Sequence, residues 1–395
     1  MATATISLNK PHQAQRDILM DRTRFRVLCI GRRWGKTEVL IIAMVNRLLK
    51  GQRIWFCSPT NRNNKQVFPK LKKALAGIPD IYINNSDYII ELPNGGYVQF
   101  ISLHEPDNLR GTGLDHIFID EAGFIKQGVW DAVLRPMLLT TQGGATFAST
   151  PNGTGTDFHT WYTRGLDPLE PNWKTYHLPS HSSPLIPSDE LDDIKRHTPE
   201  RAYRQEYLAE FLDDGGAVFR NLRACIQPPP ERWGRVVFGI DWGRVNDYTV
   251  IVAMDADTGR MLAMDRFNQI DWTLQRARLE AMATQYRPFT ILAEQNSIGD
   301  VNIEELKKSG LPVKPFKTTA QSKAEIINML SLGLEQGDIG ILDDEQVISE
   351  LQNYTVERLP SGAFRYTAPS GLHDDIVMAL ALANKARALP SRIFV

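Results

Sequence analysis

Residues 31–37, Gly-Arg-Arg-Trp-Gly-Lys-Thr, have the types and order that a phosphate-binding loop needs. Gly35 lets the backbone approach a phosphate, Lys36 supplies a positive charge for the β- and γ-phosphates, and Thr37 offers a hydroxyl to Mg²⁺. Gly31 and Gly35 enclose only three residues, whereas the usual loop has four before its Gly-Lys. The loop taken alone is therefore a loose match, because a basic turn also fits it.

An acidic pair, Asp120-Glu121, follows an apolar strand at residues 117–119. In phosphate-loop enzymes the first such carboxylate holds Mg²⁺ through water, and the second polarises the attacking water. The loop and the acidic pair occur in the expected order, each after its own strand, which predicts ATP hydrolysis with Mg²⁺.

Further residues complete the predicted nucleotide site, among them Gly31 and Arg33 in the loop itself. Thr150, in the Ser-Thr-Pro turn after the next strand, is predicted from its position to sense the γ-phosphate. Gln13 is predicted to read the adenine edge with its paired donor and acceptor, and Gln15 is the rival for that role.

A second group of carboxylates lies in the other half of the chain. Asp241 ends the strand at 237–240, Glu294 ends the strand at 291–293, and Asp374-Asp375 starts the last helix. Three converging carboxylates can bind two Mg²⁺ or Mn²⁺ ions that activate water for phosphodiester hydrolysis. Asp374 and Asp375 differ by about 100° around a helix, so the sequence leaves open which is the primary ligand.

The elements around these residues form two patterns. In the first half, strands alternate with helices, which predicts a mostly parallel sheet covered on both faces. The strands are expected at 25–30, 53–58, 116–119 and 145–149, the helices at 37–50 and 64–76, and a hairpin at 88–92 and 97–103. The second half reads as three strands, helix, strand, helix, strand and helices, which is the order of an RNase H-like domain. In such a fold the three acidic positions lie at one edge of the sheet.

Between these halves the periodicity weakens, one helix is expected at 199–210, and three prolines stand at 228–230. We therefore predict an ATPase domain at residues 1–152, a linker or lid subdomain at 153–232, and a nuclease domain at 233–395.

Composition limits the class of protein. The 395 residues are 42% hydrophobic and 23% charged, as in an ordinary globular chain. The first 100 residues hold 16 Lys and Arg against 6 Asp and Glu. This excess of positive charge could bind phosphates or could simply form a solvated basic surface. Three scattered cysteines give neither a disulfide framework nor a zinc site and favour a reducing cytoplasm. The longest apolar run, residues 39–45, is too short to span a membrane.

Taken together, the chain resembles the large terminase subunit of tailed bacteriophages, the DNA-packaging motor. The matching segments are GRRWGKT (31–37), LRGTGLDHIFIDEA (109–122), FASTPNG (147–153), FGIDWG (238–243), ILAEQ (291–295) and GLHDDIVMALALA (371–383). The resemblance implies translocation of duplex DNA into a procapsid, driven by ATP, and endonucleolytic cleavage of concatemeric DNA.

The resemblance also assigns roles and partners. Arg32 looks like the additional arginine that these enzymes carry inside the loop. Arg110 occupies the position, eleven residues before Glu121, where some members supply an arginine finger to a neighbouring subunit. The implied partners are double-stranded DNA, a portal protein, a small terminase subunit and further copies in a pentameric ring. The implied location is the host cytoplasm, transiently at the procapsid portal vertex and not in the mature virion.

Three other classes of protein share part of the pattern. A helicase-like repair translocase fused to an RNase H-like nuclease needs a second motor domain, and the sequence after Pro151 lacks a second nucleotide-binding pattern. A transposase or integrase needs no ATPase for strand transfer. An ATP-gated clamp would keep Lys36 without needing Glu121 or Glu294, which are both present. ATPase stimulated by DNA without unwinding, together with Mn²⁺-dependent nicking, separates the packaging motor from all three.

Overall fold

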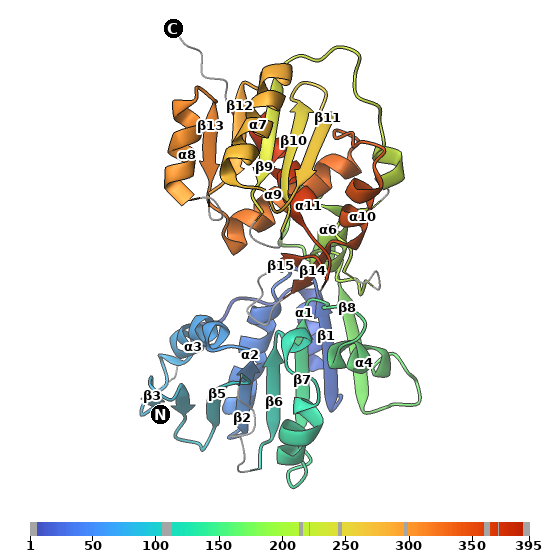
Figure 1. The fold of residues 1–395 in the computed structure, drawn as a ribbon. Coiled ribbons are helices and arrows are strands. Elements are labelled where there is room, and N and C mark those ends of the chain that lie inside the picture. Colours follow the sequence, from blue (N-terminus) through green and yellow to red (C-terminus); the bar gives the residue numbers. More distant parts are fainter. Residues whose placement is uncertain are drawn as a thin grey trace. The chain divides into compact units, whose positions relative to one another are not determined.

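The computed structural model describes residues 6–104, 113–212, 216–220, 222–243, 247–295, 299–358, 364–369 and 371–389. The chain divides into two compact units, of which the first holds residues 1–196, 200–213 and 359–363 and the second holds the rest (Figure 1). Each unit is built around its own sheet. No helix in these ranges is long and apolar enough to cross a bilayer.

The first unit contains an eight-stranded sheet with the order β3-β4-β5-β2-β6-β7-β1-β8. Its strands are β1 (Phe25–Ile30), β2 (Arg53–Ser58), β3 (Tyr82–Asn84), β4 (Ile89–Glu91), β5 (Tyr97–Ser102), β6 (His116–Asp120), β7 (Gly144–Ser149) and β8 (Trp173–Leu178). All neighbours from β5 to β8 are parallel, while β3, β4 and β5 form an antiparallel edge. The predicted mostly parallel sheet is confirmed.

Helices cover this sheet because its strands are apolar on both faces, as parallel strands require. They are α1 (Gln13–Met20), α2 (Lys36–Leu48), α3 (Asn61–Leu75), α4 (Asp157–Arg164), α5 (Ser188–His197) and α6 (Glu200–Glu206). One apolar core packs α2 and α3 against the sheet, and a second, rich in aromatic side chains, includes Trp130, Phe147 and Trp161. The sheet therefore has a buried core on each face, which fixes the strand ends that carry the loop and the acidic pair.

The segment 153–232, predicted as one subdomain, is instead divided between the two units. Its strand β8 is hydrogen-bonded in parallel to β1, with Trp173 opposite Phe25, so that it completes the first sheet. Residues Val218 and Leu222 contribute to the core of the second unit. The physical reason is that β8 lies at the edge of the sheet and mixes polar and apolar residues without a regular alternation, which leaves no strand signal in a stretch that reads as loops.

The second unit contains a five-stranded sheet with the order β11-β10-β9-β12-β13. Its strands are β9 (Val236–Asp241), β10 (Thr249–Asp255), β11 (Met261–Phe267), β12 (Thr290–Glu294) and β13 (Val313–Phe316), with a separate hairpin of β14 (Thr355–Arg358) and β15 (Phe364–Thr367). The helices are α7 (Trp272–Tyr286), α8 (Gly299–Lys308), α9 (Ala320–Glu335), α10 (Glu345–Asn353) and α11 (Asp375–Arg387). The first three strands are antiparallel and the next two are parallel to β9, which is the element order expected from the sequence.

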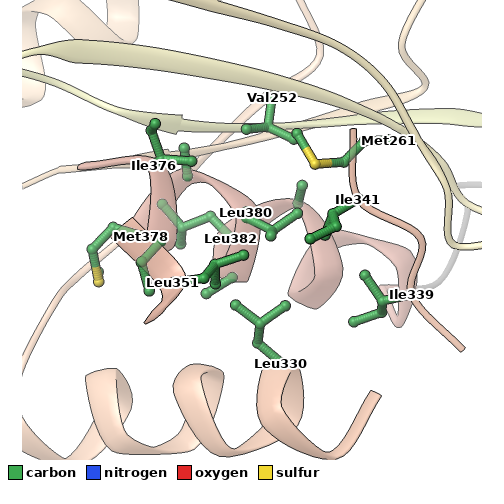
Figure 2. Close-up of a cluster of buried hydrophobic side chains, with 14 of the residues drawn as sticks. Val252, Met261, Leu330, Ile339, Ile341, Leu351, Ile376, Met378, Leu380 and Leu382 are labelled. Carbon is green, nitrogen blue, oxygen red and sulfur yellow. The ribbon is translucent and has the colours of Figure 1, made fainter. Parts of the chain in front are cut away.

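Helix α11 lies at the centre of this unit. Figure 2 shows its side chains Ile376, Leu380 and Leu382 among residues of neighbouring elements, including Leu330 of α9 and Val252 of β10. The helix approaches β9 closely at Gly239, where an added Cβ would lie 2.0 Å from the carbonyl oxygen of Ala379. A glycine inside this strand therefore sets how near α11, with its acidic start, can come to the sheet.

Candidate active sites

The phosphate-binding loop joins the end of β1 to the start of α2. Its backbone turns through two left-handed residues, Arg33 with φ 62° and Gly35 with φ 106°. The first turn of α2 then presents Lys36 and Thr37, both half-buried. A loop of this kind directs backbone N–H groups and a helix N-terminus at one point, which suits an anion. Gly31 is buried, and a Cβ added to it would lie 2.5 Å from the carbonyl oxygen of Tyr207.

The strand β6 brings the acidic pair to the same place. Lys36 Nζ donates to Glu121 Oε1 at 2.7 Å and lies 3.2 Å from Asp120 Oδ1. Burial alone would lower the pKa of Lys36, but the two carboxylates outweigh it and leave that pKa raised. Burial also raises the pKa of Asp120, against the pull of Lys36. The structure thus brings the predicted lysine and both predicted carboxylates into one ion-pair cluster, in which Asp120 is buried and Lys36 and Glu121 are half-buried.

Glu121 has a left-handed backbone, with φ 53° and ψ 45°. That conformation costs a non-glycine residue about 1–3 kcal/mol, and such strain gathers at functional sites. The Ser149 hydroxyl donates to Glu121 Oε2 at 3.4 Å. The predicted sensor Thr150 is buried directly after it, at the end of β7. The Ser-Thr-Pro turn therefore reaches the acidic pair through Ser149, a contact that the sequence reading did not assign.

The loop is anchored by residues far along the chain. Arg32 forms an ion pair through Nε with Glu206, a buried residue of α6, and its backbone N–H donates to the Glu206 carbonyl at 2.8 Å. Burial disfavours the charged guanidinium, but Glu206 outweighs this and raises the pKa of Arg32. The indole Nε1 of Trp34 donates to Ser182 Oγ at 2.8 Å. No sequence motif marked Glu206 or Ser182, because isolated Glu and Ser residues carry no signal of their own.

Two glutamines were candidates for the adenine edge. Gln13 is exposed, and its amide donates to Asp17 Oδ1 at 2.7 Å. Gln15 is buried, and its amide donates to the carbonyl oxygen of Gly35 at 3.3 Å. The structure therefore connects the rival residue to the loop, while the reading of adenine by Gln13 stays a prediction. Arg110, the predicted finger, lies outside the described residues.

The second site begins with Asp241 and Glu294. Strands β9 and β12 run parallel with Ile240 opposite Ala293, so their next residues, the two acids, are neighbours at the same sheet edge. Their carboxyl groups share a hydrogen bond. Asp241 is buried, and burial together with the charges of Glu294, Asp375 and Asp374 raises its pKa well above the ordinary value.

The acidic start of α11 completes this group. Asp375 is buried, accepts a hydrogen bond from the Tyr248 backbone N–H at 3.2 Å, and has its pKa raised to about 6, mainly by burial. Asp374 precedes the helix, and its Oδ2 accepts from Lys323 Nζ at 2.8 Å. The adjacent acids therefore have different surroundings: Asp375 lies with the buried carboxylates, and Asp374 is held by a cation.

Divalent cations fit this group by the chemistry of its donors. Mg²⁺ and Mn²⁺ prefer carboxylate oxygens, and a cation would remove the repulsion that disfavours the charged form of Asp241. As the side chains stand, no three His, Cys, Asp or Glu residues in the described ranges form a metal-binding group. Asp241 is bonded to Glu294, and Asp374 to Lys323, so binding requires these two contacts to yield.

A supporting network holds the start of α11. Glu350 of α10 accepts the Ile376 backbone N–H at 2.9 Å, and Arg266 of β11 lies 3.5 Å from the other oxygen of Glu350. The Arg266 guanidinium also lies over the ring of Tyr248, the residue whose N–H binds Asp375. These residues fix the helix start from two sides. The sequence offered no signal for Glu350 or Arg266, because neither belongs to a motif.

Known proteins resemble the chain over most of its length. The family model described as "Terminase large subunit, T4likevirus-type, N-terminal" matches residues 27–224, and that described as "Terminase RNaseH-like domain" matches residues 238–386. The large terminase subunit of Thermus virus P23-45 is 28% identical, over 95% of this chain and 87% of its own length. That of Escherichia phage T5 is 30% identical over 57% of this chain and 52% of its own.

A solved structure shares the fold over a similar extent. The large terminase of a thermophilic bacteriophage is 15% identical, covers 94% of this chain and 98% of its own, and superposes with a TM-score of 0.56. Each family model falls largely within one unit and contains one of the acidic sites described above. The chain therefore belongs to the terminase large subunit family, and it is the ATPase and nuclease subunit of a phage DNA-packaging motor.

Proposed function

We propose that the first unit converts ATP hydrolysis into movement of double-stranded DNA, and that the second cuts this DNA with two Mg²⁺ or Mn²⁺ ions. The observation that carries the proposal is the pairing of Lys36 with both Asp120 and Glu121 at the end of a parallel sheet, beside the phosphate-binding loop. That arrangement provides a cation for a triphosphate and two carboxylates for Mg²⁺ and water.

Lys36 is the residue that would couple ATP binding to catalysis. A bound triphosphate offers Lys36 a more highly charged partner than the carboxylates do. When Lys36 turns to the β- and γ-phosphates, Glu121 loses its ion pair with Lys36 and can accept a proton from the attacking water. Thr37 and Asp120 would hold the Mg²⁺, which neutralises charge on the phosphates when bound.

Two arginines are candidates for stabilising the transferred phosphoryl group. Arg32 is already in the loop and is aligned by Glu206. Arg110, by family resemblance, would reach the ATP of a neighbouring subunit, which requires a ring of copies. We assign Arg110 as the finger in trans and Arg32 as the loop arginine that senses the nucleotide in its own subunit.

In the second unit, Asp241, Glu294 and Asp375 would hold the metal ions, with Asp374 at their margin. When bound, the ions activate water and stabilise the leaving oxygen of the cleaved strand. The chain's own contribution is to exclude solvent around Asp241 and to fix Asp375 through the Tyr248 N–H. Because the raised pKa of Asp241 favours its protonated form, protons compete with the metal ions there, and cleavage should weaken at low pH.

The proposed partners are a portal protein, a small terminase subunit and further copies of this chain, assembled as a pentameric ring at the procapsid vertex in the host cytoplasm. The decisive experiment is packaging of duplex DNA into purified procapsids, followed by protection of that DNA from added nuclease. We expect protection that requires ATP and Lys36. ATP-dependent strand separation without packaging would instead favour the helicase-like repair translocase.

A further inference from the structure

A cavity of about 710 Å³ lies in the first unit, at the end of the sheet opposite to the phosphate-binding loop. The end of α1, the start of β1 and the end of α2 line it. Arg26 is the second residue of β1, whereas Gly31 follows its last residue, which places about 16 Å of strand between the two sites. The cavity is therefore separate from the nucleotide site.

The cavity is lined by four basic residues, Arg22, Arg26, Arg47 and Lys50, and by one acidic residue, Asp21. The carboxylate of Asp21 is already engaged. It accepts hydrogen bonds from the Tyr176 hydroxyl and from Thr23, and it pairs with Lys174 at 3.0 Å. This carboxylate also attracts Arg26, but it is one acid against the four basic residues that line the cavity, so the cavity keeps an excess of positive charge.

Arg26 is the buried centre of this charge, with 4% of its surface exposed. Its terminal nitrogens donate to the carbonyl oxygens of Ile18 and Asp21 and to Thr146 Oγ1, all neutral acceptors. Its Nε has no hydrogen-bond partner among the described residues. A buried N–H left unpaired destabilises the fold, and a guanidinium fits an oxyanion with two parallel hydrogen bonds.

Arg47 adds a second guanidinium. Burial and the nearby charge of Arg26 lower the pKa of Arg47 to about 10, against the weaker attraction of Asp115. Cations also gather at helix C-termini to satisfy free carbonyl groups. Here Asn94 already donates to the carbonyl oxygens of Leu48 and Leu49, so the end of α2 has another cap.

We propose that this cavity is a second anion site, which binds a phosphate group independently of the phosphate-binding loop. A motor of this family meets phosphate groups in two forms, as free phosphate or nucleotide and as the backbone of DNA. Both would place phosphate oxygens against Arg26 and Arg47. The test must therefore contain one arm for each source.

The first arm measures inorganic phosphate binding by calorimetry on the full chain, with chloride added to match ionic strength. The Lys36→Ala protein removes the main charge of the nucleotide site, and we expect it to retain phosphate binding. Adding Arg47→Gln to that protein should weaken the binding by about tenfold to hundredfold, the loss of one charge-assisted contact. Adding Lys70→Gln, which removes an exposed charge on α3, is the matched control and should change nothing.

The second arm measures binding of a labelled DNA duplex by fluorescence anisotropy in EDTA, at several salt concentrations. If the DNA backbone is the source, Arg47→Gln weakens duplex binding, lowers the salt slope by about 1, and phosphate competes with the duplex. If free phosphate or nucleotide is the source, only the first arm responds. Either result supports the site, and equal behaviour of Arg47→Gln and Lys70→Gln in both arms overturns it.

Folding is controlled separately, because Arg26 is too buried to substitute safely. Removing Arg47 relieves repulsion, so we expect Arg47→Gln to keep its circular dichroism spectrum and its Tm in phosphate-free buffer. Arg47→Lys keeps the charge and should recover part of the phosphate affinity. If Arg47→Gln does not fold, the exposed pair Arg22→Gln and Lys50→Gln tests the same cavity, and unchanged phosphate binding in that pair also refutes the proposal.

Discussion

Replacing Gly239 by alanine tests whether the close approach of α11 to β9 builds the nuclease site. The added Cβ would lie 2.0 Å from the Ala379 carbonyl oxygen and 2.2 Å from the Ala383 nitrogen, both backbone atoms of α11. Ordinary contact begins at 3.4 Å. The helix must therefore move by about 1.4 Å or the strand must bend, and overpacking of this kind costs about 1–3 kcal/mol.

The same shift displaces Asp375, which stands in the first turn of α11, from Asp241 at the end of β9. A misplacement of about 1 Å can cost about a hundredfold in rate. We therefore expect Gly239→Ala to nick plasmid DNA about a hundredfold more slowly with Mn²⁺. ATP hydrolysis should stay at the parent rate, because its residues belong to the other unit.

Gly333→Ala is the matched control in the same unit. Its added Cβ would meet the end of the Ile339 side chain, at 2.5 Å, and a flexible side chain can move away where a backbone cannot. We expect nicking within about twofold of the parent, since alanine also favours helix α9 by about 1 kcal/mol. Equal nicking by Gly239→Ala and Gly333→Ala would show that the approach at Gly239 does not position Asp375.

Other substitutions separate the two activities. Glu121→Gln should bind ATP but hydrolyse it about 10²–10⁴-fold more slowly, as measured by phosphate release, and near-normal turnover would rule out Glu121 as the base. Asp241→Asn should abolish plasmid nicking and leave ATP hydrolysis unchanged; unaffected nicking there would mean that the second unit cuts through other residues. Burial raises the pKa of Glu350 to about 7 from an ordinary 4.5, so the folded protein favours the protonated carboxyl. The contribution of this group to the free energy of unfolding is therefore complete below pH 4.5 and is lost as pH rises through 7. Without metal, Glu350→Gln should therefore raise the Tm of the second unit at about pH 8 but not at about pH 4, and an equal change at both would contradict this. Arg110→Ala and Glu121→Gln proteins, each inactive alone, should regain ATP hydrolysis when mixed, and co-assembly without recovery would refute a finger in trans.

Sequence reasoning reached the parts of the fold whose signals are local. The strands at residues 25–30 and 53–58 have the expected bounds, because their apolar runs end at clear turn residues. The acidic positions were also within reach, since carboxylates that directly follow apolar strands must share one sheet edge when the strands are parallel. The sequence did not indicate which side chains would pair with these carboxylates.

The missed features depend on contacts between distant segments. Lys323 neutralises Asp374 from a helix 51 residues earlier, and Glu206 holds Arg32 across 174 residues. Neither pair has a spacing that any local pattern contains. Gly239 does have a local signal, which our sequence analysis did not use, because a lone glycine in an apolar strand indicates a close backbone approach. Only the structure shows that the approaching element is the helix with the acidic start.

The anchors of the phosphate-binding loop bear on how ATP could produce movement. Ser180 donates to the Arg32 carbonyl at 2.7 Å, Trp34 donates to Ser182, and Arg32 is held by Glu206. Next to Glu206 in α6, Gln205 donates to the carbonyl oxygen of Pro151, the last residue of the Ser-Thr-Pro turn. The segment from β8 to α6 is thus bonded both to the loop that receives the phosphates and to the turn beside Glu121. Any shift of the loop on nucleotide binding must either break these bonds or carry that segment with it, which makes it the part of the first unit best placed to transmit the hydrolysis step.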